Sequence, residues 1–311
     1  MAVTFNDLLE GTDLTEEVKT GLQEAWESKI SEARDELTAE LREEFAQRYS
    51  HDKSQIVEAM DNFISEKVEA SPNRVALGDA GYLLEIDQLE RLDADDVYFY
   101  TGSFLINIKE PELVLNSSEY NYAKDLLNNF EANLMSNQFN NSTTGYTSFI
   151  DTASFIDWYL ISEITKNQDS RDFSSIFLNV IPGEKIKMGP LWDFDLAFGN
   201  VDYSDATNPT GFWVKDHKWY ARLFQDPAFV NKVKSRFVYF KNNQNLILNK
   251  MDFYANYLKY AQEENDIKWN VLGNYVWPNP VVYNTYQEEV NHLKNWYTNR
   301  MNWLSTAYNS L

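Results

Sequence analysis

The chain contains no cysteine and only three histidines among its 311 residues, and these scarcities exclude several kinds of chemistry. Without a thiol there can be no disulfide, no cysteine nucleophile and no zinc–thiolate site. His51, His217 and His292 are far apart in the sequence, so we expect neither a histidine metal cluster nor a Ser-His-Asp triad. No run approaches about 18 apolar residues, so no membrane span is expected. The N-terminus lacks a basic region followed by an apolar run, so no secretory signal is expected.

Positive charge is also scarce, because 27 lysines and arginines face 48 aspartates and glutamates, for a net charge of −21. Such a chain repels phosphate backbones, so no binding of nucleic acid is expected. A single nucleotide is compatible with this charge, because a few local cations or a Mg²⁺ ion can reverse the field inside one pocket. Aromatic residues make up 15% of the sequence, which predicts a folded chain.

Proline is absent from residues 1–71, which hold 18 acidic and seven basic residues and only five aromatic side chains. Residues 72–311 contain all eight prolines and the remaining aromatic residues. This change in composition predicts an acidic helical segment at 1–71 and a globular domain at 72–311. Pro72 marks the boundary, since a proline disfavours helix in the residue before it.

The first segment has the pattern of one long helix from Asp13 to about Ala70. Asp13-Leu-Thr-Glu16 fits an N-cap with a glutamate at N3. Apolar residues then recur every three or four positions: Leu14, Val18, Leu22, Trp26, Ile30, Ala33, Leu37, Leu41 and Phe45. A helix this long cannot bury such a stripe against itself, so we expect it to form an oligomer, as a coiled coil or against a partner. Spacings of four predominate, which argues against a regular left-handed heptad coil.

Residues 32–53, Glu-Ala-Arg-Asp-Glu-Leu-Thr-Ala-Glu-Leu-Arg-Glu-Glu-Phe-Ala-Gln-Arg-Tyr-Ser-His-Asp-Lys, followed by Ile56-Val-Glu-Ala-Met-Asp61, resemble the prohead core scaffolding proteins of T4-like phages. The resemblance covers about residues 5–70. It implies a segment that co-assembles inside an immature capsid and carries no catalytic residues. Together with the expected lack of an export signal, it implies a cytoplasmic or virion-associated protein.

The second segment alternates strand and helix patterns. Strands are expected at 81–87, 97–100 and 104–109, and a hairpin at 176–188 that turns at Pro182-Gly183. Helices are expected at 117–137, 151–164, 227–240, 246–264 and 286–308, each with an apolar period of three to four. The fold class is therefore α+β, with a long N-terminal helix followed by a domain dominated by helices.

Two acidic segments of this domain could carry chemistry. Asn167-Gln-Asp169 follows an apolar helix, and Trp192-Asp193-Phe-Asp195 follows the hairpin. Mg²⁺ needs carboxylate oxygens held close together and is often shared with substrate phosphates. Phosphoryl transfer needs a metal and a carboxylate that orients the attacking hydroxyl, and the order of these segments parallels that in protein kinases. Aspartates beside aromatic residues also commonly cap helices, and Asp195 could simply bind backbone amides of the next turn.

An ordered series of motifs resembles the spore coat protein H (CotH) kinase family over about residues 74–311. The series consists of Gly81-Tyr-Leu-Leu-Glu-Ile-Asp87, Ile108-Lys-Glu-Pro111, Phe155-Ile-Asp-Trp-Tyr-Leu-Ile-Ser-Glu163, Asn167-Gln-Asp169 and Gly189-Pro-Leu-Trp-Asp-Phe-Asp-Leu-Ala-Phe-Gly199. The resemblance implies an atypical protein-kinase-like fold. It also implies transfer of phosphate from ATP, with Mg²⁺, to serines of a protein substrate.

Carried over by motif, the resemblance makes Asp169 the catalytic aspartate and Asp193 the metal ligand. Asp195 would be a second, less certain metal ligand and Asn167 a supporting residue. Ser175 stands where the family often has asparagine before the strand, which implies a weaker second metal site. Lys109 could face a phosphate, although it could equally be an ordinary surface lysine.

The family's N-terminal lobe is not recognisable in the sequence. Its Arg-Gly-Asn-type strand and its Lys-Lys-Pro-Tyr-Arg segment, which help to hold the nucleotide, are not found. The resemblance therefore predicts an incomplete nucleotide pocket, which puts efficient kinase activity in question.

Three functions remain open from the sequence. The first is a CotH-like serine kinase, and the second is a phage capsid scaffold or an oligomerising structural protein with a non-catalytic globular domain. The third is a binding module that uses the aromatic residues near the C-terminus. Because the two resemblances do not normally share one polypeptide, a natural chain, a recombinant fusion and a gene-assembly artefact are all compatible with the sequence.

Overall fold

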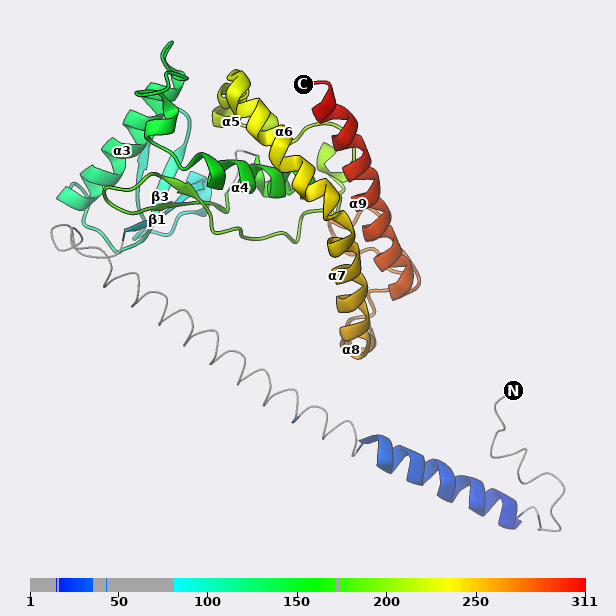
Figure 1. Ribbon diagram of the computed structural model, residues 1–311. Helices are drawn as coiled ribbons and strands as arrows, with labels where there is room; N and C mark the ends of the chain where they lie inside the picture. Colours follow the sequence, from blue (N-terminus) through cyan, green and yellow to red (C-terminus); the bar gives the residue numbers. More distant parts are fainter. Residues whose placement is uncertain (1–14, 16, 36–42, 44–80, 172–173) are drawn as a thin grey trace. The chain divides into compact units, whose positions relative to one another are not determined.

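The computed structural model describes residues 15, 17–35, 43, 81–171 and 174–311, and the chain divides into two compact units, Met1–Asn73 and Arg74–Leu311. In the first unit, residues 17–35 form a helix, drawn in blue in Figure 1. The prediction of a helix is confirmed for this stretch, and the rest of the predicted helix lies outside the described residues. Val18, Leu22, Trp26 and Ile30 are exposed along the described helix, so the predicted apolar stripe lies on its surface.

The second unit is built around one antiparallel five-stranded sheet with the strand order β2-β3-β1-β4-β5. Its strands are β1 Tyr82–Asp87, β2 Val97–Tyr100, β3 Leu105–Glu110, β4 Ile176–Val180 and β5 Lys187–Met188. All five strands match the predicted strand segments. β4 and β5 form the predicted hairpin and join the sheet beside β1, far from them in sequence.

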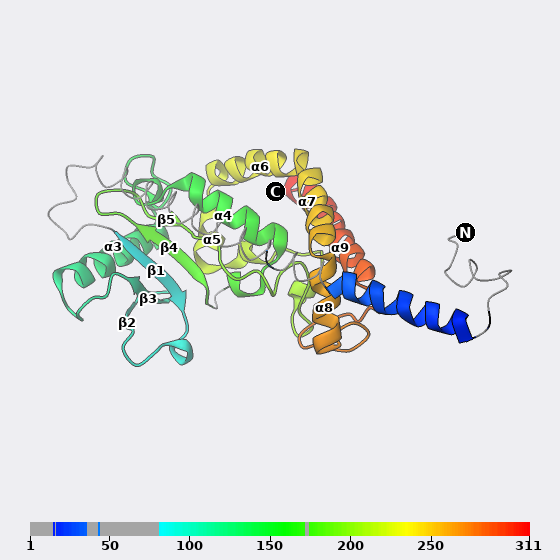
Figure 2. The same cartoon turned by 90° about the horizontal axis from the view of Figure 1, so that it is seen from below.

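Helix α3, Ser118–Met135, covers one face of this sheet (Figures 1 and 2). Successive side chains along a strand point to opposite faces of the sheet. Leu84, Ile86 and Ile106 point to the face that α3 covers, and all three are fully buried. Tyr82 stacks on Tyr122 of α3, which fixes the side of β1 that the helix covers. Ser117 caps the helix by accepting a hydrogen bond from the Tyr120 backbone N–H.

The opposite face of the sheet carries polar and aromatic side chains. Glu85 pairs in register with Asn107 of β3 and with Phe177 of β4, so the three side chains lie on this same face. Glu85 and Asn107 are buried, and Phe177 is partly buried. This face leads to the loops that hold the acidic residues.

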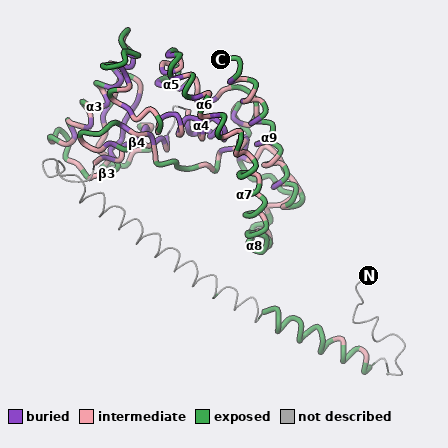
Figure 3. The backbone as a smooth tube through the Cα atoms, viewed as in Figure 1, coloured by how far each residue is buried: buried purple, intermediate pink, exposed green. Residues whose placement is uncertain are grey.

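Helix α4, Thr152–Thr165, runs through the middle of the unit, and most of its residues are buried (Figure 3). Asp151 caps its first turn by accepting a hydrogen bond from the Ser154 N–H at 2.9 Å. Lys166 ends the helix in the left-handed conformation, with φ of 51°. Because a left-handed residue turns the chain sharply, the acidic segment leaves the helix in a fixed direction.

The remaining helices form the C-terminal half of the unit (Figures 1 and 2): α5 Lys218–Leu223, α6 Pro227–Asn242, α7 Gln244–Tyr257, α8 Lys259–Trp269 and α9 Tyr286–Asn309. Short 3₁₀ turns connect the elements: η2 Leu89–Arg91, η3 Tyr146–Ser148, η4 Gln168–Ser170, η5 Asp205–Thr207 and η6 Val214–Asp216. The fold is α+β, as predicted. The helix predicted at 246–264 is two helices that meet at Leu258, and α5 was not predicted. No helix in the described ranges is long and apolar enough to cross a membrane.

Candidate functional site

Two loops from distant parts of the sequence form the acidic site. The first is the 3₁₀ turn η4 after α4, which carries Asp169 at its centre. The Asn167 side chain begins this turn by accepting a hydrogen bond from the Asp169 backbone N–H at 3.3 Å. The Asp169 residue is only 8% exposed. The sequence motif therefore produces a buried carboxylate on a rigid turn.

The second loop, residues 192–199, follows β5 and is bonded to the first loop along its length. The Asn167 amide donates to the Asp193 carbonyl at 3.0 Å, and the Gln168 N–H donates to the Leu196 carbonyl at 3.0 Å. The Phe198 N–H donates to the Thr165 carbonyl at 2.7 Å. These bonds bring Asp193 and Asp195 near Asp169.

The backbone of the second loop is bent at both ends. Asp193 has a φ of 54°, a conformation that is uncommon for residues with a side chain. At the other end Gly199 has a φ of 81°, and a Cβ there would lie 2.3 Å from Nε1 of Trp296. Trp296 belongs to α9 and donates to the Thr207 carbonyl at 2.8 Å. Only glycine allows this loop to approach α9 so closely.

The three carboxylates affect one another. Burial raises the pKa of Asp169, and the charge of Asp195 raises it further. Partial desolvation raises the pKa of Asp193, and so does the carboxylate of Asp195, which lies within hydrogen-bonding reach. Asp193 and Asp195 are exposed to solvent, whereas Asp169 is buried. Two neighbouring exposed carboxylates are an arrangement that a bound cation would stabilise.

Arg91 is the cation that acts on this cluster, and the sequence motifs did not point to it. Its charge lowers the pKa of both Asp169 and Asp193. It lies in η2 directly after β1, and its Nη1 donates to the buried Ser174 hydroxyl at 2.6 Å. A weak signal was its place four residues after the Gly81–Asp87 motif, in a chain with few basic residues.

The donor set fits Mg²⁺ bound together with a phosphate. Mg²⁺ prefers carboxylate oxygens, usually takes one or two of them from the protein, and completes its shell with water and substrate phosphates. Asp193 and Asp195 offer such a pair. Within the described parts of the chain, no group of three or more histidine or acidic side chains is arranged to hold a metal alone. The protein therefore supplies only part of a coordination shell.

Asp195 also has an ordinary structural role. One of its carboxylate oxygens accepts a hydrogen bond from the Leu196 N–H at 2.8 Å, and its carbonyl accepts from the Asn200 amide at 3.0 Å. The sequence left open whether Asp195 binds backbone amides of the next turn, and one oxygen does so. Its second oxygen takes no hydrogen bond from a described backbone N–H and is the one left to face Asp193 or a cation, so the two roles are compatible.

The two other candidates lie along the polar face of the sheet. Ser175 has a φ of 62° and donates its backbone N–H to Glu85 Oε1 at 2.9 Å. Burial raises the pKa of Glu85, while the Ser175 bond and the charge of Lys109 lower it. Lys109 is near the exposed end of β3, and its Nζ lies 3.8 Å from an Asp96 oxygen. The structure thus places Lys109 beside Glu85 and Asp96, and places Arg91 beside the aspartates.

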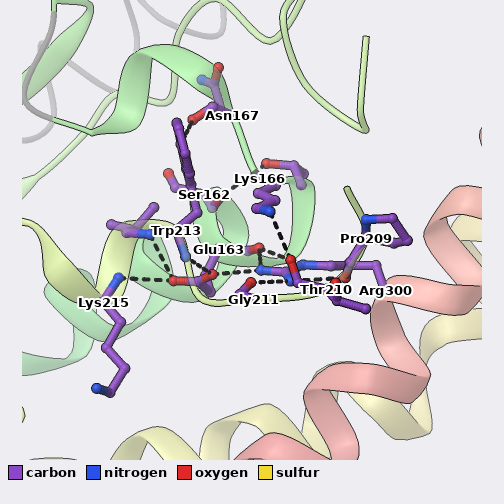
Figure 4. Close-up of polar contacts among 12 residues, drawn as sticks. Ser162, Glu163, Lys166, Asn167, Pro209, Thr210, Gly211, Trp213, Lys215 and Arg300 are labelled. Atoms are coloured by element: carbon purple, nitrogen blue, oxygen red, sulfur yellow. Dashed lines mark hydrogen bonds and ion pairs between the residues drawn. The ribbon is translucent and has the colours of Figure 1, made fainter. Parts of the chain in front are cut away.

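A buried ionic network holds the first loop in place (Figure 4). The Glu163 and Arg300 side chains are both fully buried, and their charged atoms lie 2.6 Å apart. Glu163 also accepts hydrogen bonds from the backbone N–H groups of Trp213, Val214 and Lys215. Arg300 donates to the carbonyls of Pro209 and Gly211. Three segments of the chain therefore meet at the last turn of α4, just before the acidic site.

Lys166 extends this network. Its buried Nζ donates to the carbonyls of Asp205, Asn208 and Thr210 at 2.6–2.9 Å. Burial and the charge of Arg300 lower the pKa of Lys166 to about 8. Lys166 and Arg300 thus bind the same connecting segment from two sides. Nothing distinctive in the sequence marks either residue, since each looks like an ordinary helix cation.

Aromatic side chains flank the acidic site on two sides. Trp192 is exposed and packs edge-on against Phe177, with ring centroids 6.1 Å apart, which places it at the polar face of the sheet. Tyr203 stacks on Trp277 at 6.0 Å, and partial burial, with the charges of Asp169 and Asp195, raises the pKa of Tyr203. The site is therefore a carboxylate cluster between two aromatic surfaces.

Comparison with known proteins gives one match. A family model described as CotH kinase protein matches residues 55–304. The match begins earlier than the resemblance predicted and includes residues 55–70, which we had compared with phage scaffolding proteins. No curated protein and no solved structure matches the chain. The resemblance of the first segment to phage scaffolding proteins stays a prediction.

Proposed function

The chain belongs to the CotH kinase protein family, and on this premise we propose that the acidic site transfers phosphate from Mg²⁺-ATP to a serine of a protein substrate. The observation that carries the proposal is the convergence of Asp169, Asp193 and Asp195 from two loops that are bonded to each other. Phosphoryl transfer is catalysed mostly by positioning and by neutralising charge, and this site offers both.

Each carboxylate has a role that suits its environment. The Asp193 carboxylate and the Asp195 carboxylate oxygen that does not accept from Leu196 would hold Mg²⁺. When bound, Mg²⁺ neutralises charge on the phosphates. Asp169 is buried on a rigid turn with a raised pKa, which suits a group that orients the serine hydroxyl and accepts its proton. Arg91 adds a positive charge close to where the transferred phosphate would lie.

The polar face of the sheet is the best place for the nucleobase. Phe177 and Trp192 offer aromatic surface there, and Trp192 directly precedes the metal ligand Asp193. Bases stack readily on aromatic side chains, with on the order of 1–3 kcal/mol for each stacked base. Glu85 on the same face, which is 8% exposed, offers a carboxylate to the base or ribose.

Nucleotide binding by the intact chain tests the proposal. We expect ATP with Mg²⁺ to raise the melting temperature, and Asp193→Asn to weaken Mg²⁺-dependent binding at least about tenfold, or 1.4 kcal/mol. Asp169→Asn should keep nucleotide binding but lower phosphate transfer by about 10²–10⁴-fold, because the proton acceptor is lost. Calorimetry and labelled γ-phosphate transfer to a serine-rich protein measure the two effects.

Asp125→Asn is the matched control, because Asp125 is exposed on α3, on the side of the molecule away from both loops. It should bind ATP like the unchanged chain. If ATP with Mg²⁺ neither shifts the melting temperature nor binds by calorimetry, the proposed activity is wrong. The globular unit would then be the non-catalytic domain of an oligomerising structural protein.

A further inference from the structure

Helices α7 and α8 form a surface feature that the acidic site does not use. Both views of the chain show α7 continuing into α8 along nearly the same line (Figures 1 and 2). Leu258, between them, departs from helical geometry, with φ of −85° and ψ of 0°, but the hydrogen bonds on its two sides continue. It donates to the Tyr254 carbonyl and accepts from the Gln262 N–H, both at 2.9 Å. The two helices therefore share one continuous surface.

An exposed apolar stripe runs along this surface with a spacing of seven residues. Its members are Leu246, Phe253, Tyr260 and Ile267, which are 60%, 56%, 71% and 80% exposed. Lys250 lies between the first two, with its Nζ 5.4 Å from the centre of the Phe253 ring. No residue of either helix is buried, although large apolar side chains are frequent in both.

Packing against the rest of the unit does not account for this stripe. The residues of α7 that pack against the core are Leu248 and Met251, which face another side of the helix. α7 thus has two apolar sides, one on the core and one in solvent. Apolar residues seven apart occupy one of the two core positions of the heptad by which helices pair with one another. A side of the helix that only faces solvent does not need apolar residues at this spacing.

We propose that the stripe pairs with the same stripe of a second copy of this chain, in antiparallel orientation about a two-fold axis near residues 256 and 257. In this register Leu246 of one copy lies opposite Ile267 of the other, and Phe253 lies opposite Tyr260. The four apolar positions then meet only one another. A two-fold interface needs a self-complementary surface of this kind.

The charges beside the stripe favour this orientation. In the antiparallel register, Lys250 comes level with Glu263 and Glu264 of the second copy, on both sides of the axis. A parallel pairing would place Lys250 against itself and the two glutamates against themselves, which destabilises the pair. Charge therefore favours the antiparallel pair over the parallel pair, which apolar contacts alone would not distinguish.

The same charges favour a second copy over a partner of opposite charge. α7 and α8 together carry three lysines and four acidic residues, in a chain whose net charge is −21. Two such chains repel each other over most of their surface and least along this nearly neutral stripe. A strongly basic partner would find more attraction elsewhere on the molecule.

The size of the surface is adequate for a modest interface. The stripe spans 21 residues of helix, or about 30 Å at 1.5 Å per residue. Aromatic side chains bury on the order of 150–250 Å² each when fully covered. Because the four stripe residues are 56–80% exposed, they would bury less than the roughly 800 Å² per partner of a standard interface, as a modest interface does.

Cysteine cross-linking of the full chain tests the register directly, because the chain has no cysteine of its own. We expect Leu246→Cys mixed with Ile267→Cys to form a covalent dimer with a short bismaleimide, while neither variant forms one alone. In the antiparallel register, Leu246 lies about 30 Å from its own counterpart, beyond the reach of the reagent. Efficient cross-linking of each variant alone would indicate a parallel pair and overturn the proposal, as would no cross-linking in the mixture.

A second measurement separates this interface from any association through residues 13–70. Phe253→Glu and Tyr260→Glu should each weaken self-association at least tenfold by sedimentation equilibrium, because they place a carboxylate in the apolar pair. Asn265→Glu is the matched control. It adds the same charge to an exposed position of α8, roughly 140° around the helix from Tyr260. Equal effects of the three substitutions, or a chain that is monomeric at tens of micromolar, would refute the stripe as an interface.

Discussion

At the scale of single residues, the unit buries several ionisable groups, and His217 is the most perturbed of those that titrate near neutral pH. It is fully buried, and its ring stacks on Phe104 at 4.9 Å and contacts Trp219 edge-on at 6.2 Å. Burial, with a smaller effect from the charge of Lys218, lowers the pKa of His217 to about 3. The ring therefore stays neutral in the folded chain over the whole physiological range.

This burial makes stability depend on pH in a defined window. The unfolded chain binds the proton near pH 6.5 and the folded chain only near pH 3, so acid favours unfolding between these values. The contribution is constant above about pH 6.5 and lost progressively below it. We expect His217→Phe to reduce the loss of stability between about pH 7 and pH 5 by about 2 kcal/mol. Urea unfolding at the two pH values measures it, and parallel losses in both proteins would contradict the assignment.

At the scale of elements, the unit depends on contacts between α4 and α9, which are far apart in sequence. Glu163 near the end of α4 and Arg300 in the middle of α9 form a fully buried ion pair. The same pair binds the segment from Pro209 to Lys215, which has little regular structure of its own. Because Asn167 follows α4 directly, the position of the acidic site depends on this junction.

Breaking the buried pair should therefore be costly. Arg300→Met leaves the Glu163 carboxylate buried without its cation, and we expect a loss of about 3–5 kcal/mol in the free energy of unfolding. Arg236→Met is the matched control, because Arg236 pairs with Asp157 of the same helix α4 but both side chains are well exposed. That change should cost less than about 1 kcal/mol. Denaturant unfolding compares the two, and similar losses would show that burial does not decide the contribution.

The sequence predicted most elements of the fold because their apolar patterns are simple. Buried apolar residues alternate along β1 and β4, β3 begins with four buried residues, and α3 has one apolar side. The helix predicted at 246–264 was wrong because neither proline nor glycine marks the break at Leu258. α5 was missed because six residues are too short for a helical period to show.

The acidic site was predictable in part, for a different reason. Asp169 and Asp193 could be placed together because one follows a buried helix and the other a hairpin, and family resemblance supplied the pairing. Arg91 and Arg300 could not be predicted in this way. Arg300 lies 137 residues from its partner Glu163, and nothing local distinguishes a buried arginine from a surface one. Such contacts become visible only when the elements have been packed.

At the scale of the whole molecule, the two compact units differ in how they are stabilised. Every residue of the described hydrophobic core lies between Tyr82 and Tyr308. In the first unit, none of residues 17–35 is buried, so this described helix gains little from tertiary packing. The family match nevertheless begins at residue 55, before the boundary between the units at Asn73 and Arg74. The family match thus extends about twenty residues before this boundary.

Two shortened chains, residues 55–311 and 74–311, test whether the stable domain begins at residue 55 or at residue 74. If the core of the second unit is complete between Tyr82 and Tyr308, both chains should melt within a few degrees of the full chain. A change of 1 kcal/mol in the free energy of unfolding shifts the melting temperature of a domain this large by about 2–4 °C. Differential scanning calorimetry measures the transitions. A much lower transition for 74–311 alone would show that residues 55–73 stabilise the second unit. In that case residues 55–73 would be a structural part of the family's domain. A segment whose removal destabilises the core of the second unit must pack against that core.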